Sequence, residues 1–174
     1  MSDIETLSSP DPESESASAG GASASDLVPL AGVEPEAGDE PVLQRLRQGG
    51  MTVGDAAMFA SGDADLTAAG RRELEEMLPE LKAAVAELSA GGQWSLRVEG
   101  HTDDRPVLPN GRWSSNWALS AARASTIAEY LVDKGFPARH LMAVGFADTQ
   151  PLVQGDDNAA RNRNRRIQLR LVEG

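Results

Sequence analysis

The stretch WSLRVEGHT, residues 94–102, alternates apolar and polar side chains, and this alternation constrains the fold more than any other feature of the sequence. Its apolar residues share one parity and its polar residues the other: Trp94, Leu96 and Val98 against Ser95, Arg97 and Glu99. Because successive side chains of a strand point to opposite faces, the pattern predicts a strand that is buried on one face only. Such a strand requires a layer of other elements on its apolar face.

Two long amphipathic segments can supply that layer. Residues 67–88 carry apolar side chains at helical spacing and begin at Thr67, a favourable N-cap residue. Residues 116–134 repeat the spacing, and Gly135 is suited to end that helix in a left-handed conformation. Pro79 lies inside the first segment and predicts a kink or a new turn there. The predicted buried stripes are Leu74, Met77, Leu78, Leu81, Val85 and Leu88 in the first helix, and Trp117, Ala121, Ala124, Ile127, Ala128 and Leu131 in the second.

Three further segments are expected to complete the sheet. Residues 51–59 are predicted as a weak first strand, residues 140–146 as the third strand and residues 165–172 as the fourth. The order β-α-β-α-β-β predicts an α+β fold, an α/β sandwich with two helices packed on one face of a small mixed four-stranded sheet. We expect this domain to span residues 51–174, with residues 41–50 forming a linker or a short helix.

The net charge of −11 is concentrated near the N-terminus. Residues 1–40 contain ten Asp or Glu and no Lys or Arg, whereas residues 41–174 contain seventeen acids and sixteen bases. The first segment is also rich in Ser, Ala, Pro and Gly, so we predict a disordered acidic tail at residues 1–40. An acidic chain repels phosphate backbones, which argues against binding of nucleic acid.

The sequence predicts neither a membrane span nor an export signal in this chain. No apolar run reaches the roughly eighteen residues of a transmembrane helix, and the N-terminus lacks the basic and apolar regions of a secretory signal. The chain contains no Cys, so disulfides and thiolate metal sites are excluded.

The turn GHTDDRP, residues 100–106, gathers the polar residues that could carry chemistry. His101 and Asp103 are too few for a closed metal site, and consecutive acids such as Asp103 and Asp104 diverge too much to flank a scissile bond. A triad with Ser120 can be drawn, but no nucleophile elbow accompanies it. We therefore predict no metal, no cofactor and no enzymatic activity.

Arginines could form the positively charged side of a binding site whose negatively charged side is the acidic turn. Arg123 lies near the start of the second helix, where backbone N–H groups also favour anions. Arg165 shares its parity with the apolar residues of the last strand and is predicted on the helix-covered face, with Arg166 and Arg170 on the bare face. If these arginines meet the acidic turn, the site suits a ligand that carries an ammonium and a carboxylate close together. The alternative is a solvated basic edge that discourages edge-to-edge pairing.

Several separated motifs occur in the order that is typical of one family. RVEGHTDDRP, SNWALSAARASTIAEYLVDKG, HLMAVGFADTQPLV and NRNRRIQLRLV resemble the OmpA-like (OmpA/MotB C-terminal) peptidoglycan-binding domain, and they are closest in motif to the flagellar stator B subunit branch. Residues 58–74 also resemble the family's entry segment before its first helix. The resemblance covers about residues 51–173, nearly all of the chain that we expect to fold.

The resemblance implies non-catalytic binding of peptidoglycan through the diaminopimelate of its stem peptides. By motif, Asp103 would hold the ammonium of that residue and Arg123 its carboxylate. Thr102 and Asn116 would shape the pocket, and Arg165 would flank it. Asp104 is then expected to be a turn or rim residue.

The resemblance also implies an anchor or tether in the periplasm or cell envelope, although this chain carries no predicted export signal or membrane span. It is compatible with a membrane-protein partner and with a homodimer. The alternative interpretation is an OmpA-like fold that has lost wall binding and serves as a protein–protein interaction module.

Overall fold

The computed structural model describes residues 40–88 and 92–174, so the predicted disordered tail lies, except for its last residue, outside the described residues. Residues 42–48, where a linker or short helix was predicted, form a helix. The elements are α1 (Val42–Gln48), β1 (Met51–Gly54), α2 (Asp55–Met58), α3 (Ala68–Leu88), β2 (Trp94–His101), α4 (Asn116–Asp133), a 3₁₀ turn η1 (Ala138–His140), β3 (Leu141–Gly145), α5 (Asn158–Asn164) and β4 (Arg166–Glu173).

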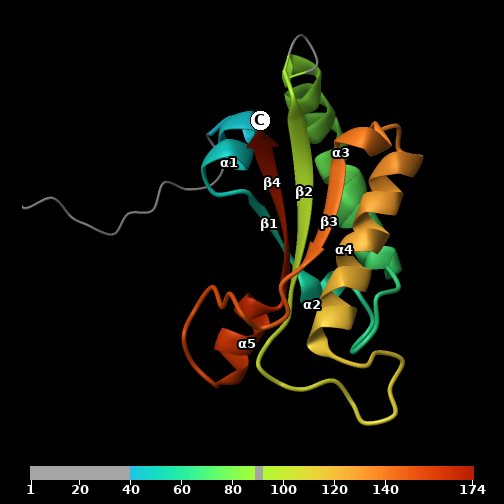
Figure 1. The fold of residues 1–174 in the computed structure, drawn as a ribbon, viewed down its shortest axis with the longest axis vertical. Coiled ribbons are helices and arrows are strands. Elements are labelled where there is room, and N and C mark those ends of the chain that lie inside the picture. Colours follow the sequence, from blue (N-terminus) through green and yellow to red (C-terminus); the bar gives the residue numbers. More distant parts are fainter. Residues whose placement is uncertain (1–39, 89–91) are drawn as a thin grey trace, which may run out of the picture. The chain divides into compact units, whose positions relative to one another are not determined.

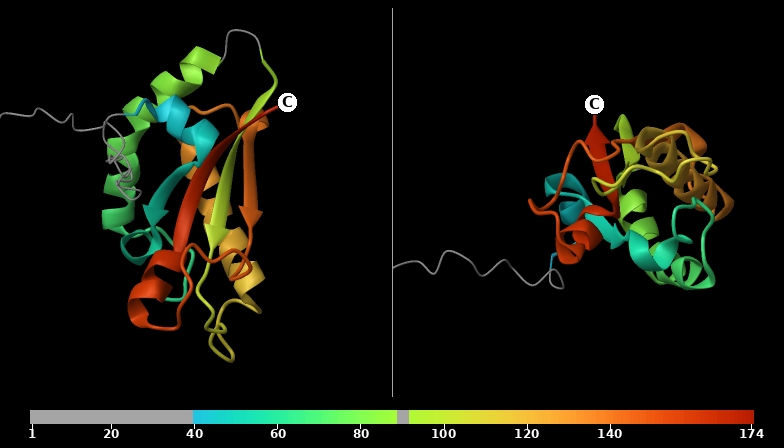
Figure 2. Two further views of the ribbon diagram at one scale, coloured as in Figure 1. Left: turned by 90° about the vertical axis from the view of Figure 1, so that its left-hand side faces the viewer. Right: turned by 90° about the horizontal axis from the view of Figure 1, so that it is seen from below.

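Four strands form one mixed sheet in the order β1-β4-β2-β3 (Figure 1). β4 is antiparallel to both of its neighbours, and β2 is parallel to β3. Helices α3 and α4 lie behind the sheet in the left view of Figure 2, where they cover one of its faces. The predicted α+β fold with a mixed four-stranded sheet is therefore confirmed. Its core is apolar and includes the fully buried Leu81, Leu96, Val98, Ile127, Leu131, Ile167 and Leu169.

Two boundaries differ from the sequence prediction. The first strand ends at Gly54 instead of residue 59, because Asp55 opens the short helix α2. The arginine-rich stretch before the last strand forms helix α5, whose N-cap Asp157 accepts a hydrogen bond from the Ala160 N–H at 2.7 Å. This helix is too short and too polar to show an apolar period. The first long helix agrees with the prediction at its start, since Thr67 accepts from the Gly70 N–H, and it runs through Pro79 as one element.

The predicted buried stripe of α4 was wrong at two positions. Trp117 is 54% exposed and Ala121 is exposed. The helix instead turns Ser120 and Arg123 inward, because its backbone at Ser120 and Ala121 lies directly on the ends of β2 and β3. The residues buried on α4 are Leu119, Ser120, Arg123, Ala124, Ile127 and Leu131.

Two glycines make this close approach possible. A Cβ placed on Gly100 would lie 2.1 Å from the backbone oxygen of Ser120, and one on Gly145 would lie 2.5 Å from the Ala121 nitrogen. The Ser120 hydroxyl locks the contact, since it accepts from the Ala147 N–H at 3.0 Å and donates to the Trp117 carbonyl at 3.1 Å. The start of α4 is therefore fixed against the carboxyl ends of β2 and β3, where the acidic turn begins.

We expect Gly100→Ala to destabilise the fold by at least about 2–3 kcal/mol, because the added methyl meets backbone that cannot rotate away. Urea unfolding followed by circular dichroism measures this loss. Gly54→Ala is the matched control, since a Cβ there has nothing within 4 Å. Equal midpoints for Gly100→Ala and the wild type would contradict the close approach.

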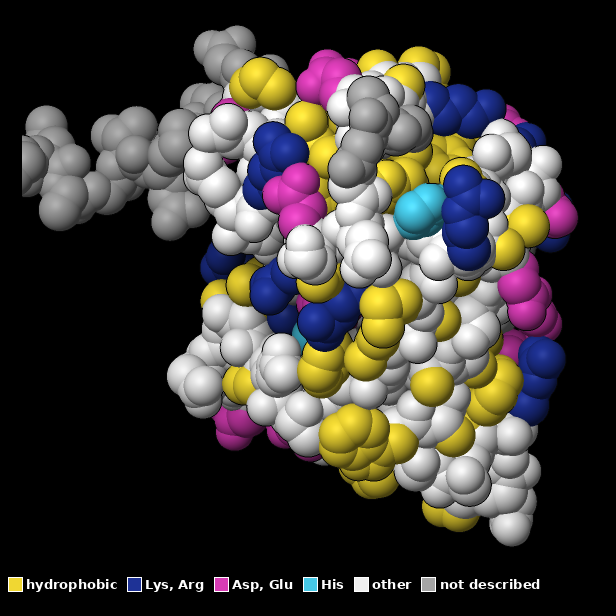
Figure 3. Space-filling model, turned by 45° about the horizontal axis from the view of Figure 1, so that its top comes forward, with side chains coloured by type: hydrophobic (Ala, Val, Ile, Leu, Met, Phe, Trp, Pro, Cys, Tyr) yellow, Lys and Arg dark blue, Asp and Glu magenta, His cyan; other side chains and the backbone are white. Residues whose placement is uncertain are grey.

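The other face of the sheet carries a polar network in place of helices. Glu99 is only 2% exposed, its Oε1 lies 2.9 Å from Arg97 Nη2, and its Oε2 lies 3.9 Å from His101 Nε2. Arg166 is buried beside this group and donates to the carbonyls of Asn164 and Gln150, both at 3.2 Å, so it ties α5 and the loop before it to β4. In Figure 3, basic side chains lie beside hydrophobic ones on the surface of the domain. Exposed members of this face are Arg170, Met142 and Val172.

The pKa of Glu99 is lowered in the folded protein. Burial alone would raise it, but the nearby His101 and the charges of Arg170 and Arg97 outweigh that effect. A carboxyl with a lowered folded-state pKa stabilises the fold above its ordinary pKa, and this contribution is lost as the pH falls through the folded-state value.

We therefore expect Glu99→Gln to cost about 1–3 kcal/mol near pH 7, since it removes the counter-charge of the half-buried Arg97 and the buried Arg166. The difference from wild type should shrink below about pH 4.5, the range in which the wild-type carboxyl gains its proton. Urea midpoints measured from pH 3 to pH 8 give both values. Glu129→Gln, an exposed acid, is the control, and a pH-independent difference for Glu99→Gln would refute the role of its charge.

Candidate functional site

Two ion pairs meet where the acidic turn, α2, α4 and the end of α5 come together. Asp103 Oδ2 lies 2.5 Å from Arg165 Nη1, and Asp55 Oδ2 lies 2.6 Å from Arg123 Nη1. The Asp55 N–H donates to the Arg165 carbonyl at 3.3 Å, which joins the two pairs through the backbone. The charges of Asp103 and Arg165 also act on the pKa values of both Asp55 and Arg123. The four residues thus form one cluster, with two positive and two negative charges.

The inner pair, Asp55 and Arg123, is buried. The two residues are 3% and 4% exposed, and Arg123 also donates from Nε to the Asp63 carbonyl at 2.7 Å and lies over the Phe59 ring. Burial raises the pKa of the Asp55 carboxyl despite the nearby Arg123 and Arg165, and burial lowers the pKa of Arg123 despite Asp55. Within the described residues, the Nη2 amine of Arg123 has no hydrogen-bond acceptor. The inner pair therefore holds α2 against α4 and keeps one guanidinium amine unused.

The outer pair, Asp103 and Arg165, lies closer to the surface. The Arg165 side chain is 28% exposed and the Asp103 side chain 9%. Asp103 Oδ1 accepts from the Arg105 N–H at 3.0 Å, and Arg165 also donates to the side chain of Asn162. Because the Arg165 side chain reaches solvent, a ligand cation can approach Asp103 and take the place of Arg165.

Asn116 fixes the acidic turn at the start of α4. Its side-chain amide donates to the carbonyls of Asp103 at 3.4 Å and Arg105 at 2.8 Å. Asn116 thus holds the backbone of the turn, and Ser115, not Asn116, caps the helix by accepting from the Ala118 N–H. The turn is therefore pre-shaped before any ligand arrives.

Two sequence predictions about this cluster need correction or addition. Arg165 lies just before the last strand and not within it, because α5 ends at Asn164 and β4 begins at Arg166. Sequence analysis also missed Asp55, since it lay inside a segment interpreted as a strand. Asp is disfavoured in strands and favoured at helix starts, so its position after Gly54 was a signal for a helix start.

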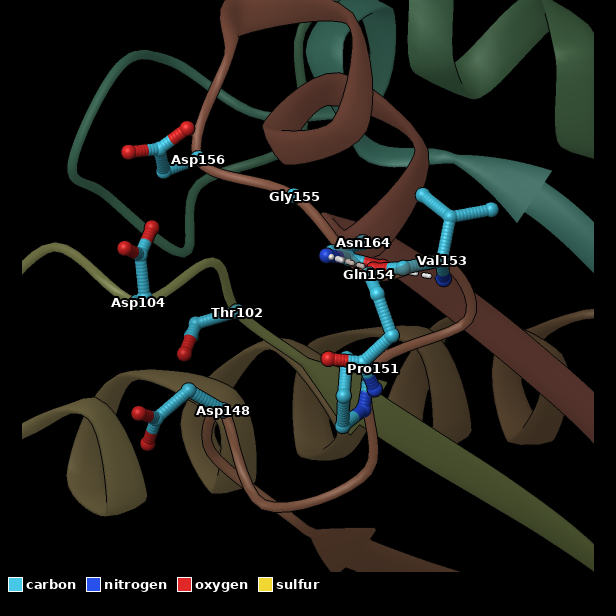
Figure 4. Close-up of a pocket in the computed structure, with 9 residues that line it drawn as sticks. All are labelled: Thr102, Asp104, Asp148, Pro151, Val153, Gln154, Gly155, Asp156 and Asn164. Carbon is cyan, nitrogen blue, oxygen red and sulfur yellow. Dashed lines mark hydrogen bonds between the residues drawn. The ribbon is translucent and has the colours of Figure 1, made fainter.

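A separate pocket lies beside the same turn (Figure 4). Thr102 points into it instead of toward the cluster, as expected for the neighbour of Asp103 in an extended segment. Asp104 lines it too, and its carboxylate accepts from Arg161 Nε at 2.7 Å and Nη2 at 3.1 Å, which lowers the Asp104 pKa. The cavity measures about 420 Å³ and is lined by Thr102, Asp104, Asp148, Pro151, Val153, Gln154, Gly155, Asp156 and Asn164.

A mixed sheet with its helices on one face, and a charged turn at the end of β2 packed against the start of α4, define an OmpA-like domain. Residues 58–165 match the OmpA family, and the chain belongs to that family. The resemblance noted from the sequence motifs is thereby confirmed.

Sequence relatives include a peptidoglycan-associated lipoprotein and a motility protein. The chain is 33% identical over 116 residues to the uncharacterized protein YtxE of Bacillus subtilis, covering 66% of this chain and 44% of that one. It is 37% identical over 94 residues to the peptidoglycan-associated lipoprotein of Haemophilus influenzae, covering 54% and 58%. It is 33% identical over 117 residues to motility protein B of Escherichia coli, covering 66% and 34%. The matched region thus spans about half or less of these relatives' lengths.

Solved structures agree with the fold. A MotB-like protein from Desulfovibrio vulgaris is 27% identical with a TM-score of 0.60, covering 71% of this chain and 72% of that one. The cell wall anchor of the T6SS from Pseudomonas aeruginosa is 30% identical with a TM-score of 0.56, covering 71% and 79%. Among the described residues, no helix has the length and apolar character to cross a bilayer.

We expect Asp55→Asn to destabilise the domain by about 3–5 kcal/mol, because it leaves the buried guanidinium of Arg123 without a counter-charge. Urea unfolding at pH 7 measures the loss. Asp65→Asn, which breaks the exposed pair with Arg112, is the control and should change the midpoint little. A small effect of Asp55→Asn would mean that the inner pair does not hold α2 against α4.

Proposed function

We propose that this chain binds peptidoglycan non-catalytically, through the diaminopimelate of stem peptides, and so tethers an envelope component to the cell wall. The observation that carries the proposal is the outer ion pair of Asp103 and Arg165 beside the buried Arg123. Asp103 would receive the ligand ammonium and Arg123 and Arg165 its carboxylate. Asn116 would shape the surroundings, whereas Thr102 faces the neighbouring pocket.

Binding would proceed by exchange of ion-pair partners. The cluster is neutral overall, and so is the ammonium–carboxylate end of an amino acid. The ligand ammonium would displace Arg165 from Asp103, and the released guanidinium would pair with the ligand carboxylate, so one ion pair becomes two. The unused Nη2 amine of Arg123 is a second donor for that carboxylate.

A single stem peptide would be held weakly. Charge-assisted hydrogen bonds contribute roughly 1.5–3 kcal/mol each when shielded, and association costs at least several kcal/mol. A polymeric wall repeats the same group many times, so rebinding and multivalency raise the overall affinity. Weak individual contacts of this kind suit a tether.

The comparisons support the proposal. One relative is named for its association with peptidoglycan, and a solved structure that is 30% identical is a cell wall anchor. We accordingly propose that the chain acts in the periplasm or cell envelope, where a membrane-protein partner would provide the second attachment that a tether needs.

Co-sedimentation with purified sacculi tests the proposal. We expect wild type to pellet with diaminopimelate-type sacculi, and Asp103→Asn and Arg165→Gln each to lose roughly tenfold or more in affinity, the loss of one charge-assisted contact. Lysine-type sacculi keep the ammonium but lack the neighbouring carboxylate, so wild type should bind them more weakly by a similar factor.

Two control variants change exposed charges outside the cluster. They are Arg163→Gln in α5, the helix that precedes Arg165, and Asp133→Asn at the far end of α4. Both should bind like wild type. Equal pelleting of wild type and the two site variants would refute the proposed site, and absence of wild-type pelleting would refute wall binding and favour an interaction module.

A further inference from the structure

The pocket beside the acidic turn has one acidic side. In Figure 4, the carboxylates of Asp156, Asp104 and Asp148 succeed one another along that side, with Thr102 between the last two. Arg161 neutralises Asp104, whereas Asp148 and Asp156 are exposed and form no hydrogen bond or ion pair within the described residues. Asp148 therefore faces the cavity without a charged partner among the residues described, and Asp156 shares the charge of Arg161 with Asp104 without a direct ion pair.

A buried hydroxyl independently points to a ligand. Thr102 is only 5% exposed, and its Oγ1 has no hydrogen-bond partner in the part of the chain that the structure describes. In Figure 4 this hydroxyl is directed between Asp104 and Asp148. A buried hydroxyl without a partner is costly, and a donor bound between the carboxylates would satisfy it.

The opposite wall is partly apolar, with Pro151 and Val153 beside the polar Gln154 and Asn164. Pro151 and Val153 line it, and the Asn164 side chain fixes Val153 by accepting from its N–H at 3.0 Å and donating to its carbonyl at 2.9 Å (Figure 4). The described residues contain no group of three acids or histidines placed to hold a metal ion. The pocket therefore suits an organic cation with a methylene stem: carboxylates for the charged end, and Pro151 and Val153 for the stem.

We infer that this pocket binds a primary alkylammonium group, as a second cation site beside the Asp103 cluster. Thr102 faces the pocket and Asp103 the cluster, so a single extended segment separates the two sites. A wall presents free amino groups of stem peptides at many neighbouring points, and we assign the pocket to such an amine. This source rests on the proposed function, whereas the ammonium chemistry does not.

The chemistry is tested by NMR titration of the full chain with butylamine, using 1-butanol as the uncharged probe of the same shape. Butylammonium should shift the amide signals of Thr102, Asp148 and Gly155, and 1-butanol should not. Asp148→Asn combined with Asp156→Asn should raise the dissociation constant roughly fivefold or more. Glu129→Gln combined with Asp133→Asn, which removes the same charge from the end of α4, should leave it unchanged.

Three outcomes overturn this inference in part or whole. Equal shifts with butanol, or no shifts at the pocket, would refute the ammonium site whether or not the chain binds the wall. If the Asp148/Asp156 variant loses butylammonium but pellets normally with sacculi, the amine does not come from the wall and a partner protein's lysine becomes the source. Acetylation of the free amines of sacculi should weaken wild-type pelleting more than pelleting of this variant, and an equal effect would also refute the wall as the source.

If wild type fails to pellet at all, the proposed function fails, and the butylamine titration still decides whether the pocket accepts an ammonium. Two separate sites are supported if the Asp148/Asp156 variant loses both butylammonium binding and sacculus affinity, and if the Asp103→Asn variant still binds butylammonium.

Discussion

The contact of α4 with the ends of β2 and β3 is the constraint on which the rest of the site depends. Because Gly100 and Gly145 carry no side chains, the helix backbone lies directly on the strands, and Ser120 bonds to both sides of the junction. This approach turns Arg123 inward and brings the acidic turn over the start of the helix. The charges of the site are therefore positioned by backbone packing, and their mutual attraction follows from that packing.

The cluster combines a fixed part with an exchangeable part. Asp55 and Arg123 are so deeply buried that desolvation outweighs their attraction, as the opposite pKa shifts of the two groups show. The surrounding structure holds this pair in place, so the pair forms a rigid wall that fixes the position of the Arg123 guanidinium. Asp103 and Arg165, nearer to solvent, can change partners without disturbing that wall.

Patterns of period two and 3.6 were sufficient to predict the strands, the two long helices and their packing on one face, because each signal depends on a residue's near neighbours in sequence. The convergence of Asp103, Arg123 and Arg165 could be predicted from their places at element ends, but their pairing could not. Arg123 was expected to be free for a ligand, but its Nη1 amine donates to Asp55. The two residues are 68 positions apart, and nothing in the sequence near either one indicates the contact. The predicted burial of Trp117 was wrong for a related reason, because glycines on other elements set the rotation of α4 about its axis.

Different elements pack at the two ends of the sheet. The charged cluster lies where β2 ends and β4 begins, whereas α1 packs at the opposite end, where Arg47 pairs with Glu173 (Figure 1). Tension applied between these two ends would run parallel to the strands. Interstrand hydrogen bonds are perpendicular to that direction, so β4 could slide only if the bonds to β1 and β2 broke together. Because β4 is hydrogen-bonded along both of its edges, such tension would load the domain in shear, the arrangement that best resists mechanical load.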